Sequence, residues 1–173
     1  PKIFSQAEYG LTRALIDTAT ILSILATLGT TPVIYKFFPY YRSLTEPKKN
    51  DLPFITGAIC LIGFIVICAA GYIFKDFIIR KLGKSPLFAD NFFLVYPFTF
   101  FMLLFTWMEA FGWSFKKTVT TNFLRETFIR LLTTVMILMV WAGWISTMDF
   151  MHAFSFIYLL PAIVLFYVLY QTH

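Results

Sequence analysis

The sequence predicts an all-α protein, a polytopic bundle of transmembrane helices, from its hydrophobicity, its aromatic content and its long apolar segments. Of the 173 residues, 59% are hydrophobic and only 13% are charged. A soluble domain of this size does not reach that balance, because it cannot bury so much apolar surface. Aromatic residues make up 20% of the chain, including 22 Phe, which suits a surface in contact with lipid. We therefore expect hydrocarbon to surround most of the chain.

Five apolar segments are each long enough to cross the roughly 30 Å of a bilayer core, which takes about 20 helical residues. We place these helices at about 9–35, 52–74, 91–113, 120–145 and 150–170. No Gly/Ser linker or low-complexity tract divides them, so residues 1–173 are expected to form one helical domain. The chain opens with Pro1 and no signal-peptide pattern, and we expect it to begin inside a longer protein.

The net charge of +5 does not predict nucleic-acid binding, because the basic residues lie in the short gaps between apolar segments. Membrane lipids and anionic lipid substrates are the expected partners. Counting Lys and Arg in these gaps gives eight on one side and six on the other, which predicts that the 39–51 loop is cytoplasmic and the 75–90 loop external. The eight are Lys36, Arg42, Lys48, Lys49, Lys116, Lys117, Arg125 and Arg130; the six are Lys2, Arg13, Lys75, Arg80, Lys81 and Lys84.

A polar stripe runs along the first predicted helix. Arg13, Asp17, Thr20, Thr27 and Thr31 fall within about 40° of one line at 100° per residue. In one interpretation the stripe is a wall of an aqueous cavity, with Asp17 available for ion coupling. In the other, the first two residues, at i and i+4, neutralise each other near the outer interface.

The same segment contains Gly29 and Pro32. A proline inside a helix removes one hydrogen bond, and a glycine loosens the turn before it. These residues predict a kink or break, which serves either as a hinge in a transporter or as a packing kink.

Two charged residues are predicted to lie within later spans. Glu109 is the only acid in the third helix, where it can serve as a proton or cation site or form a structural pair with Lys116 or Arg130. An uncompensated ion at the bilayer centre costs about 2.5–3.5 kcal/mol. Arg130 lies about two turns into the fourth helix and either reaches inward or extends to the headgroups. It shares one face with Asn122, Glu126 and Thr133.

The sequence contains no pattern that predicts an enzyme. No His, Cys or carboxylate cluster has metal-ligand spacing, no Gly-rich phosphate loop is present, and no Ser or Cys nucleophile has a base in a defined motif. No metal and no cofactor are therefore expected. Cys60 and Cys68 lie about 12 Å apart along one helix, too far to form a disulfide.

Three segments resemble a known family. They are Ala7-Glu8-Tyr9-Gly10-Leu11, then Leu28-Gly29 with Lys36-Phe37-Phe38-Pro39-Tyr40-Tyr41-Arg42, and Thr121-Asn122-Phe123-Leu124-Arg125-Glu126. Together they resemble the polysaccharide-biosynthesis flippases, relatives of the multidrug and toxin extruders and of the lipid II and oligosaccharidyl-lipid flippases.

This resemblance implies two six-helix lobes around a central cavity, which carry a lipid-linked sugar across the inner (cytoplasmic) membrane by alternating access. The chain would supply helices two to six of the first lobe, with a second lobe of the same protein as its partner. Arg13 and Arg130 would line the cavity, and Lys36 and Arg125 would lie nearer its cytoplasmic mouth.

Two alternatives remain open at the level of the sequence. A cation-coupled multidrug or metabolite extruder of the same superfamily would use Asp17 and Glu109 to couple the ion gradient. A non-transporting membrane scaffold of a polysaccharide synthase would have neither a central cavity nor a solvent-facing stripe.

Overall fold

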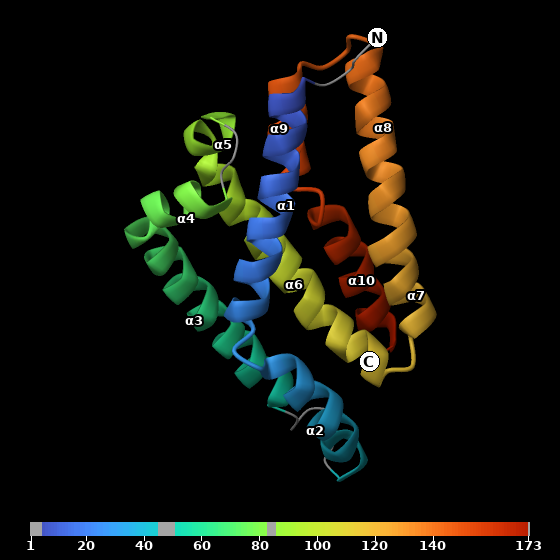
Figure 1. Cartoon of the computed structure of the whole chain (residues 1–173). Helices are drawn as coiled ribbons and strands as arrows, with labels where there is room; N and C mark the ends of the chain where they lie inside the picture. Colours follow the sequence, from blue (N-terminus) through green and yellow to red (C-terminus); the bar gives the residue numbers. More distant parts are fainter. Residues whose placement is uncertain (1–4, 45–50, 83–85, 173) are drawn as a thin grey trace.

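The computed structural model describes residues 5–44, 51–82 and 86–172, and this part of the chain is all-helical, with no strand (Figure 1). Lys2, Lys48, Lys49 and Lys84 of the charge count lie outside the described residues. The elements are α1 Gln6–Ala26, α2 Thr30–Leu44, α3 Leu52–Ile73, α4 Lys75–Leu82, α5 Pro86–Asp90, η2 Phe92–Leu94, α6 Val95–Ser114, α7 Thr118–Asn122, η3 Phe123–Phe128, α8 Ile129–Trp141, α9 Thr147–Phe154 and α10 Leu159–Thr172.

The first predicted helix is two helices with a 50° bend between them. Ser5 caps α1 through a reciprocal pair of hydrogen bonds with Glu8, and α1 ends where Leu28 and Gly29 adopt positive φ angles of 46° and 78°. Pro32 lies in the first turn of α2, where a missing N–H removes no helical hydrogen bond. The left-handed backbone at Leu28 and Gly29 therefore ends the helix, and our prediction that Pro32 contributes by removing a bond is wrong.

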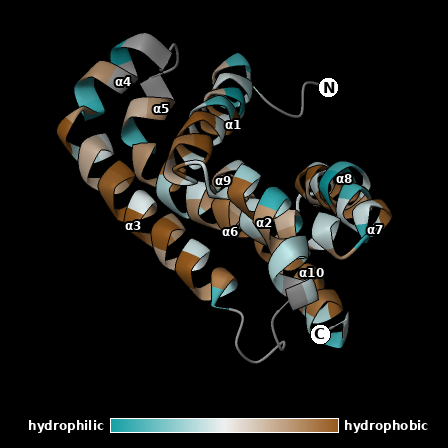
Figure 2. Cartoon of the chain, turned by 90° about the horizontal axis from the view of Figure 1, so that it is seen from below, coloured by the Kyte–Doolittle hydropathy of each residue, from teal (hydrophilic) through white to brown (hydrophobic). Residues whose placement is uncertain are grey.

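Three helices in the described part of the chain are long and apolar enough to cross a membrane, or up to four if α1 and α2 count as one bent span. The three cover Leu52–Ile73, Phe92–Ser114 and Thr147–Thr172. Of an 18-residue apolar stretch of α3, only 17% is buried inside the bundle. Figure 2 shows that α3 is hydrophobic along most of its length. Such a helix is suited to face lipid rather than water.

The segment predicted at 120–145 is helical but irregular. It begins as α7, continues as the π-helical η3 and becomes regular again in α8, which ends before Gly143 with a φ of 75°. Single π-helical turns inside α-helices are often found at functional sites. The segment predicted at 150–170 is also divided, because a turn at 155–158 separates α9 from α10.

The link predicted between residues 75 and 90 contains two short helices, α4 and α5. Phe88 of α5 is fully buried and belongs to the core that also contains Leu11 and Leu15 of α1. Phe88 therefore anchors α5 to the bundle.

Helix α6 forms the centre of the bundle and packs against α1, α2, α3 and α10. Close approach depends on small residues where α1 meets α3, because a Cβ on Gly63 would collide with the carbonyl oxygen of Ala26. Small residues let membrane helices approach closely enough for dispersion forces to hold them. The fold thus presents one aromatic central helix, with the remaining long helices around it.

Candidate functional site

A groove runs between α1 and α8 on one side of α6. The groove contains an apolar cavity of about 320 Å³. The lining side chains come from α1, α6, α8, α9 and the turn before α10: Tyr9, Thr12, Ile16, Phe98, Ile129, Thr133, Ile137, Phe150, Phe154, Ile157 and Tyr158. A groove bordered by helices from both ends of the chain is a plausible site of substrate contact in a helical membrane protein.

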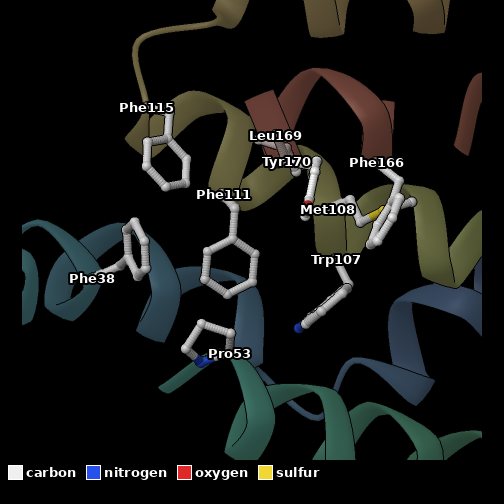
Figure 3. Close-up of a pocket in the computed structure, with 9 residues that line it drawn as sticks. All are labelled: Phe38, Pro53, Trp107, Met108, Phe111, Phe115, Phe166, Leu169 and Tyr170. Atoms are coloured by element: carbon white, nitrogen blue, oxygen red, sulfur yellow. The ribbon is translucent and has the colours of Figure 1, made fainter. Parts of the chain in front are cut away.

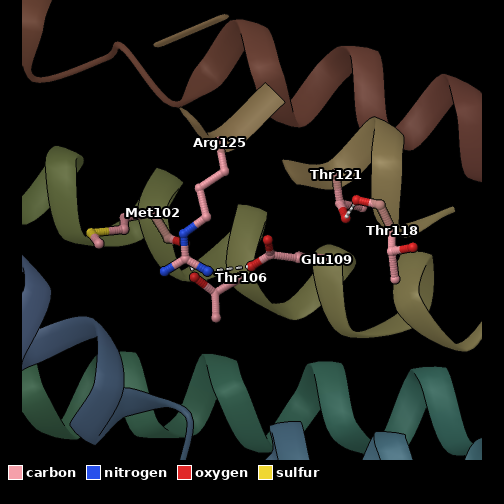
Figure 4. A network of polar contacts seen from close by, with 6 residues as sticks. All are labelled: Met102, Thr106, Glu109, Thr118, Thr121 and Arg125. Atoms are coloured by element: carbon pink, nitrogen blue, oxygen red, sulfur yellow. Dashed lines mark hydrogen bonds and ion pairs between the residues drawn. The ribbon is translucent and has the colours of Figure 1, made fainter. Parts of the chain in front are cut away.

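A buried ion pair links α6 to η3 beside this groove. Nη1 of Arg125 lies 2.7 Å from Oε2 of Glu109 (Figure 4). The Glu109 side chain is 3% exposed and that of Arg125 is 43% exposed. The carboxylate is therefore held inside the bundle, while part of the guanidinium remains accessible.

The surroundings of this pair supply few further polar contacts. The hydroxyl of Thr106 donates to the carbonyl of Met102, and Thr121 donates to the carbonyl of Thr118, so both hydroxyls bond to their own helices (Figure 4). Within the described residues, Oε1 of Glu109 has no hydrogen-bond partner. A buried oxygen without a partner costs free energy, and such sites commonly take up a water, an ion or a ligand group.

Tyr158 connects the surroundings of the ion pair to the apolar cavity. Tyr158 packs against a buried cluster that contains Met108 and Leu124, the residues immediately before Glu109 and Arg125 in the sequence. Tyr158 also lines the apolar cavity. The ion pair therefore lies near the end of the groove, where the apolar lining gives way to charge.

The structure corrects the predicted partner of Glu109. We expected Lys116 or Arg130, but Arg125 occupies that position. Lys116 lies beyond the end of α6 with a φ of 60°, and the turn there directs α7 and η3 back along α6. Arg130 is five residues beyond Arg125, or about 7.5 Å further along the helix. The lateral pairing depends on the turn geometry, which the sequence pattern did not indicate.

Arg13 and Arg130, the two arginines predicted to line the cavity, each form an exposed ion pair with a residue four positions away on the same helical segment. Arg13 lies 3.2 Å from Asp17, with side chains 70% and 51% exposed. Arg130 lies 2.7 Å from Glu126, with side chains 79% and 61% exposed. Pairs of this kind at i and i+4 contribute only about 0.3–0.5 kcal/mol. The structure brings neither Arg13 nor Arg130 to the Glu109–Arg125 pair.

The polar stripe of the first helix does not continue past the bend. Thr20 keeps its place on α1 and donates to the carbonyl of Ile16, whereas Thr27 is buried and caps the end of the helix. Thr31 belongs to α2, whose axis has turned by 50°. Lys36 is exposed on α2, with its Nζ 5.5 Å from the ring centroid of Phe37. The predicted single stripe is therefore shortened to Arg13, Asp17 and Thr20.

Among the described residues, no group of three or more His, Cys, Asp or Glu side chains is placed to hold a metal ion. The described residues form an all-helical bundle in which three or four helices are long and apolar enough to cross a membrane, as in polytopic helical membrane proteins. Searches with the chain found no matching protein family, no matching curated protein and no matching solved structure.

Proposed function

We propose that this chain is one lobe of a flippase that moves an anionic lipid-linked sugar across the inner membrane by alternating access. The observation that carries the proposal is the half-exposed guanidinium of Arg125, which the buried carboxylate of Glu109 holds beside the groove. A cation held at a defined place beside an apolar groove suits a substrate that combines a phosphate with a hydrocarbon tail.

The chemistry of Arg125 supports phosphate recognition. A guanidinium carries five N–H donors in a planar fork, and one of its nitrogens is bonded to Glu109. The remaining donors can hold a phosphate through two parallel hydrogen bonds, a geometry that a lysine ammonium does not reproduce. Glu109 acts as a positioning residue, because it fixes the direction in which the fork points.

The exposed ion pairs on α1 and α8 support a second body facing this groove. Arg13, Asp17, Glu126 and Arg130 all carry side chains that are more than half exposed. Charges in transmembrane helices almost always face protein or a water-filled cavity rather than lipid. A second lobe opposite α1 and α8 would enclose these pairs in an aqueous cavity between two rocking halves.

The break between α1 and α2 supplies an element for such a movement. A bend centred on Leu28 and Gly29 leaves α1 and α2 free of a continuous helical hydrogen-bond ladder. Discontinuous helices of this kind line substrate sites in many transporters. In this proposal Gly29 is the hinge residue, and Pro32 stiffens the start of α2.

The test is a flipping assay in proteoliposomes with a fluorescent polyprenyl-diphosphate sugar, scored by protection from an external reductant. Arg125→Lys is expected to slow flipping although the charge is kept, because the fork is lost. The double variant Glu109→Gln/Arg125→Gln replaces the two charges by amides that can hydrogen-bond to each other. This variant is expected to be folded and inactive. Arg130→Ala and Arg130→Lys test the separate prediction that Arg130 reaches the substrate.

The matched control is Lys75→Gln, which removes a charge at the opposite end of the bundle. Flipping at the wild-type rate by the folded double variant would show that the Glu109–Arg125 pair does not bind substrate. Arg130→Ala at the wild-type rate would make Arg130 a headgroup-facing residue. Absence of flipping by the wild-type protein with both lobes present would reject the flippase proposal.

One observation favours a second candidate, a cation-coupled extruder. Oε1 of Glu109 is buried and has no partner within the described residues, so the carboxylate has capacity for a proton or cation. Uptake of an organic cation that depends on Glu109 but not on Arg125 would support this alternative over the flippase.

A further inference from the structure

A larger cavity lies on another side of α6. It has a volume of about 540 Å³ and lies between α2, α3, α6 and α10 (Figure 3). Trp107 and Phe111 line it and are each two residues from Glu109, so they project from the opposite side of the helix. The volume falls within the usual range of ligand pockets, about 300–1,000 Å³. The lining residues are Phe38, Pro53, Trp107, Met108, Phe111, Phe115, Phe166, Leu169 and Tyr170.

The lining of this cavity selects for hydrocarbon. Among the lining side chains, only Trp107 and Tyr170 carry a nitrogen or oxygen atom. The indole N–H of Trp107 donates to the hydroxyl of Thr56 at 3.1 Å, which ties α6 to α3 and occupies that donor. A polar ligand would find almost no partner here, and desolvating it without partners is unfavourable.

The open side of the cavity faces the bilayer. Phe38, Met108 and Phe111 are buried at the back, whereas Phe166 and Tyr170 of α10 are 64% and 75% exposed. The opening therefore lies beside the outer surface of α10, near the start of α3 at Pro53. Both helices belong to segments long and apolar enough to cross a membrane, and we infer from this that the opening meets lipid acyl chains.

Basic residues lie at the end of this cavity. Phe115 lines it, and the next two residues, Lys116 and Lys117, are exposed. Asp51, two residues before the lining residue Pro53, is an exposed acid. Two lysines beyond the end of a membrane helix attract anionic headgroups, at about 1 kcal/mol, or about fivefold in affinity, for each Lys near the surface.

We propose that this cavity binds one acyl chain of an anionic membrane phospholipid, with the lipid phosphate between Lys116 and Lys117. Aromatic walls hold the chain, and the two lysines select the headgroup. The site is independent of the flippase proposal, because it lies on the side of α6 away from Arg125 and its test does not use transport.

Trp107 is a natural reporter of occupancy. In the purified protein, Trp113, Trp141 and Trp144 are replaced by Phe, and the protein is reconstituted in phosphatidylcholine vesicles with added phosphatidylglycerol that carries brominated acyl chains. Bromine quenches tryptophan fluorescence only at short range, so an occupying chain is expected to quench Trp107. Absence of quenching would overturn the proposal, and would show that protein covers the cavity or that it stays empty.

Two leucines on opposite faces of α10 provide a matched pair of variants. Leu169 lines the cavity, whereas Leu160, nine positions earlier in the same helix, is 51% exposed and half a turn out of phase. Leu169→Phe is expected to fill the cavity and remove most of the quenching, and Leu160→Phe to leave it unchanged. Equal quenching in both variants would mean that Trp107 senses only bulk lipid, which contradicts the proposal.

The headgroup is tested with Lys116→Gln/Lys117→Gln against the distant pair Lys75→Gln/Arg80→Gln. The first variant is expected to lower the preference for brominated phosphatidylglycerol over brominated phosphatidylcholine by about fivefold for each lysine removed. The second is expected to keep the preference. An unchanged preference in the first variant would reject the anionic headgroup.

Discussion

At the residue scale, burial separates three ion pairs. Arg13–Asp17 and Glu126–Arg130 are exposed pairs on single helices. Glu109–Arg125 joins two helices, and its carboxylate is 3% exposed. Breaking a buried pair leaves an uncompensated charge in a medium of low dielectric constant, whereas breaking an exposed pair returns the partner to a polar environment.

We therefore expect Arg125→Ala to lower the free energy of unfolding by about 3–5 kcal/mol, because it leaves the buried carboxylate of Glu109 unpaired. Arg13→Ala, the matched control in an exposed pair, is expected to change it by less than about 1 kcal/mol. Denaturant unfolding of the detergent-solubilised protein measures both. Equal losses in the two variants would show that Glu109 is hydrated rather than buried in a dry core.

The sequence was informative about which residues carry charge inside helices, and less so about their partners. Glu109 stands out because it is the only acid in its apolar segment, and a structural pair was one of its two predicted roles. The identity of its partner depends on the turn after α6, where Lys116 has a φ of 60°. No local pattern specifies that geometry, because a non-glycine residue rarely adopts it.

At the element scale, apolar length predicted regular helices well and irregular ones poorly. The predicted helices at 52–74 and 91–113 differ by about a residue from Leu52–Ile73 and Phe92–Ser114. Gly29 predicted the break of the first helix. The π-helical η3 has no breaker that announces it. The turn at 155–158 is followed by Pro161 in the first turn of α10, which cannot donate a helical hydrogen bond to the carbonyl of Ile157.

Two glycines of α3, Gly63 and Gly71, test how closely α3 packs against its neighbours. A Cβ on Gly63 would collide with the carbonyl oxygen of Ala26, whereas a Cβ on Gly71 would lie 3.5 Å from the ring of Tyr96, an ordinary contact. Gly63→Ala is expected to separate α1 from α3 and to lower the free energy of unfolding by about 1–3 kcal/mol.

Gly71→Ala is the control and is expected to be neutral or stabilising by up to about 1 kcal/mol, because alanine favours helix. Thermal unfolding in detergent compares the two variants. If Gly63→Ala proved as stable as Gly71→Ala, α1 and α3 would approach each other less closely than the structure shows.

At the scale of the whole molecule, two surfaces differ in character. The exposed side of α3 is apolar, with Leu61, Ile62, Ile65 and Val66 all more than half exposed. The exposed side of α1 and α8 carries Arg13, Asp17, Glu126 and Arg130. A bilayer accepts the first surface and disfavours the second. The molecule therefore has one side suited to lipid and one side suited to water or to another protein domain.

The orientation of the bundle is the final prediction. Lys116 and Lys117 follow the end of α6. Lys75 and Arg80 lie on α4, which follows the end of α3 at the opposite end of the bundle. The excess of basic residues on the side of the 39–51 loop predicts that Lys117 is cytoplasmic and Arg80 external.

Single cysteines at these two exposed positions, on a background with Cys60→Ser and Cys68→Ser, report the orientation in intact cells. We expect a membrane-impermeant maleimide to label Arg80→Cys in intact cells and Lys117→Cys only after permeabilisation. Labelling of Lys117→Cys from outside would invert the topology and place the proposed phospholipid site in the outer leaflet.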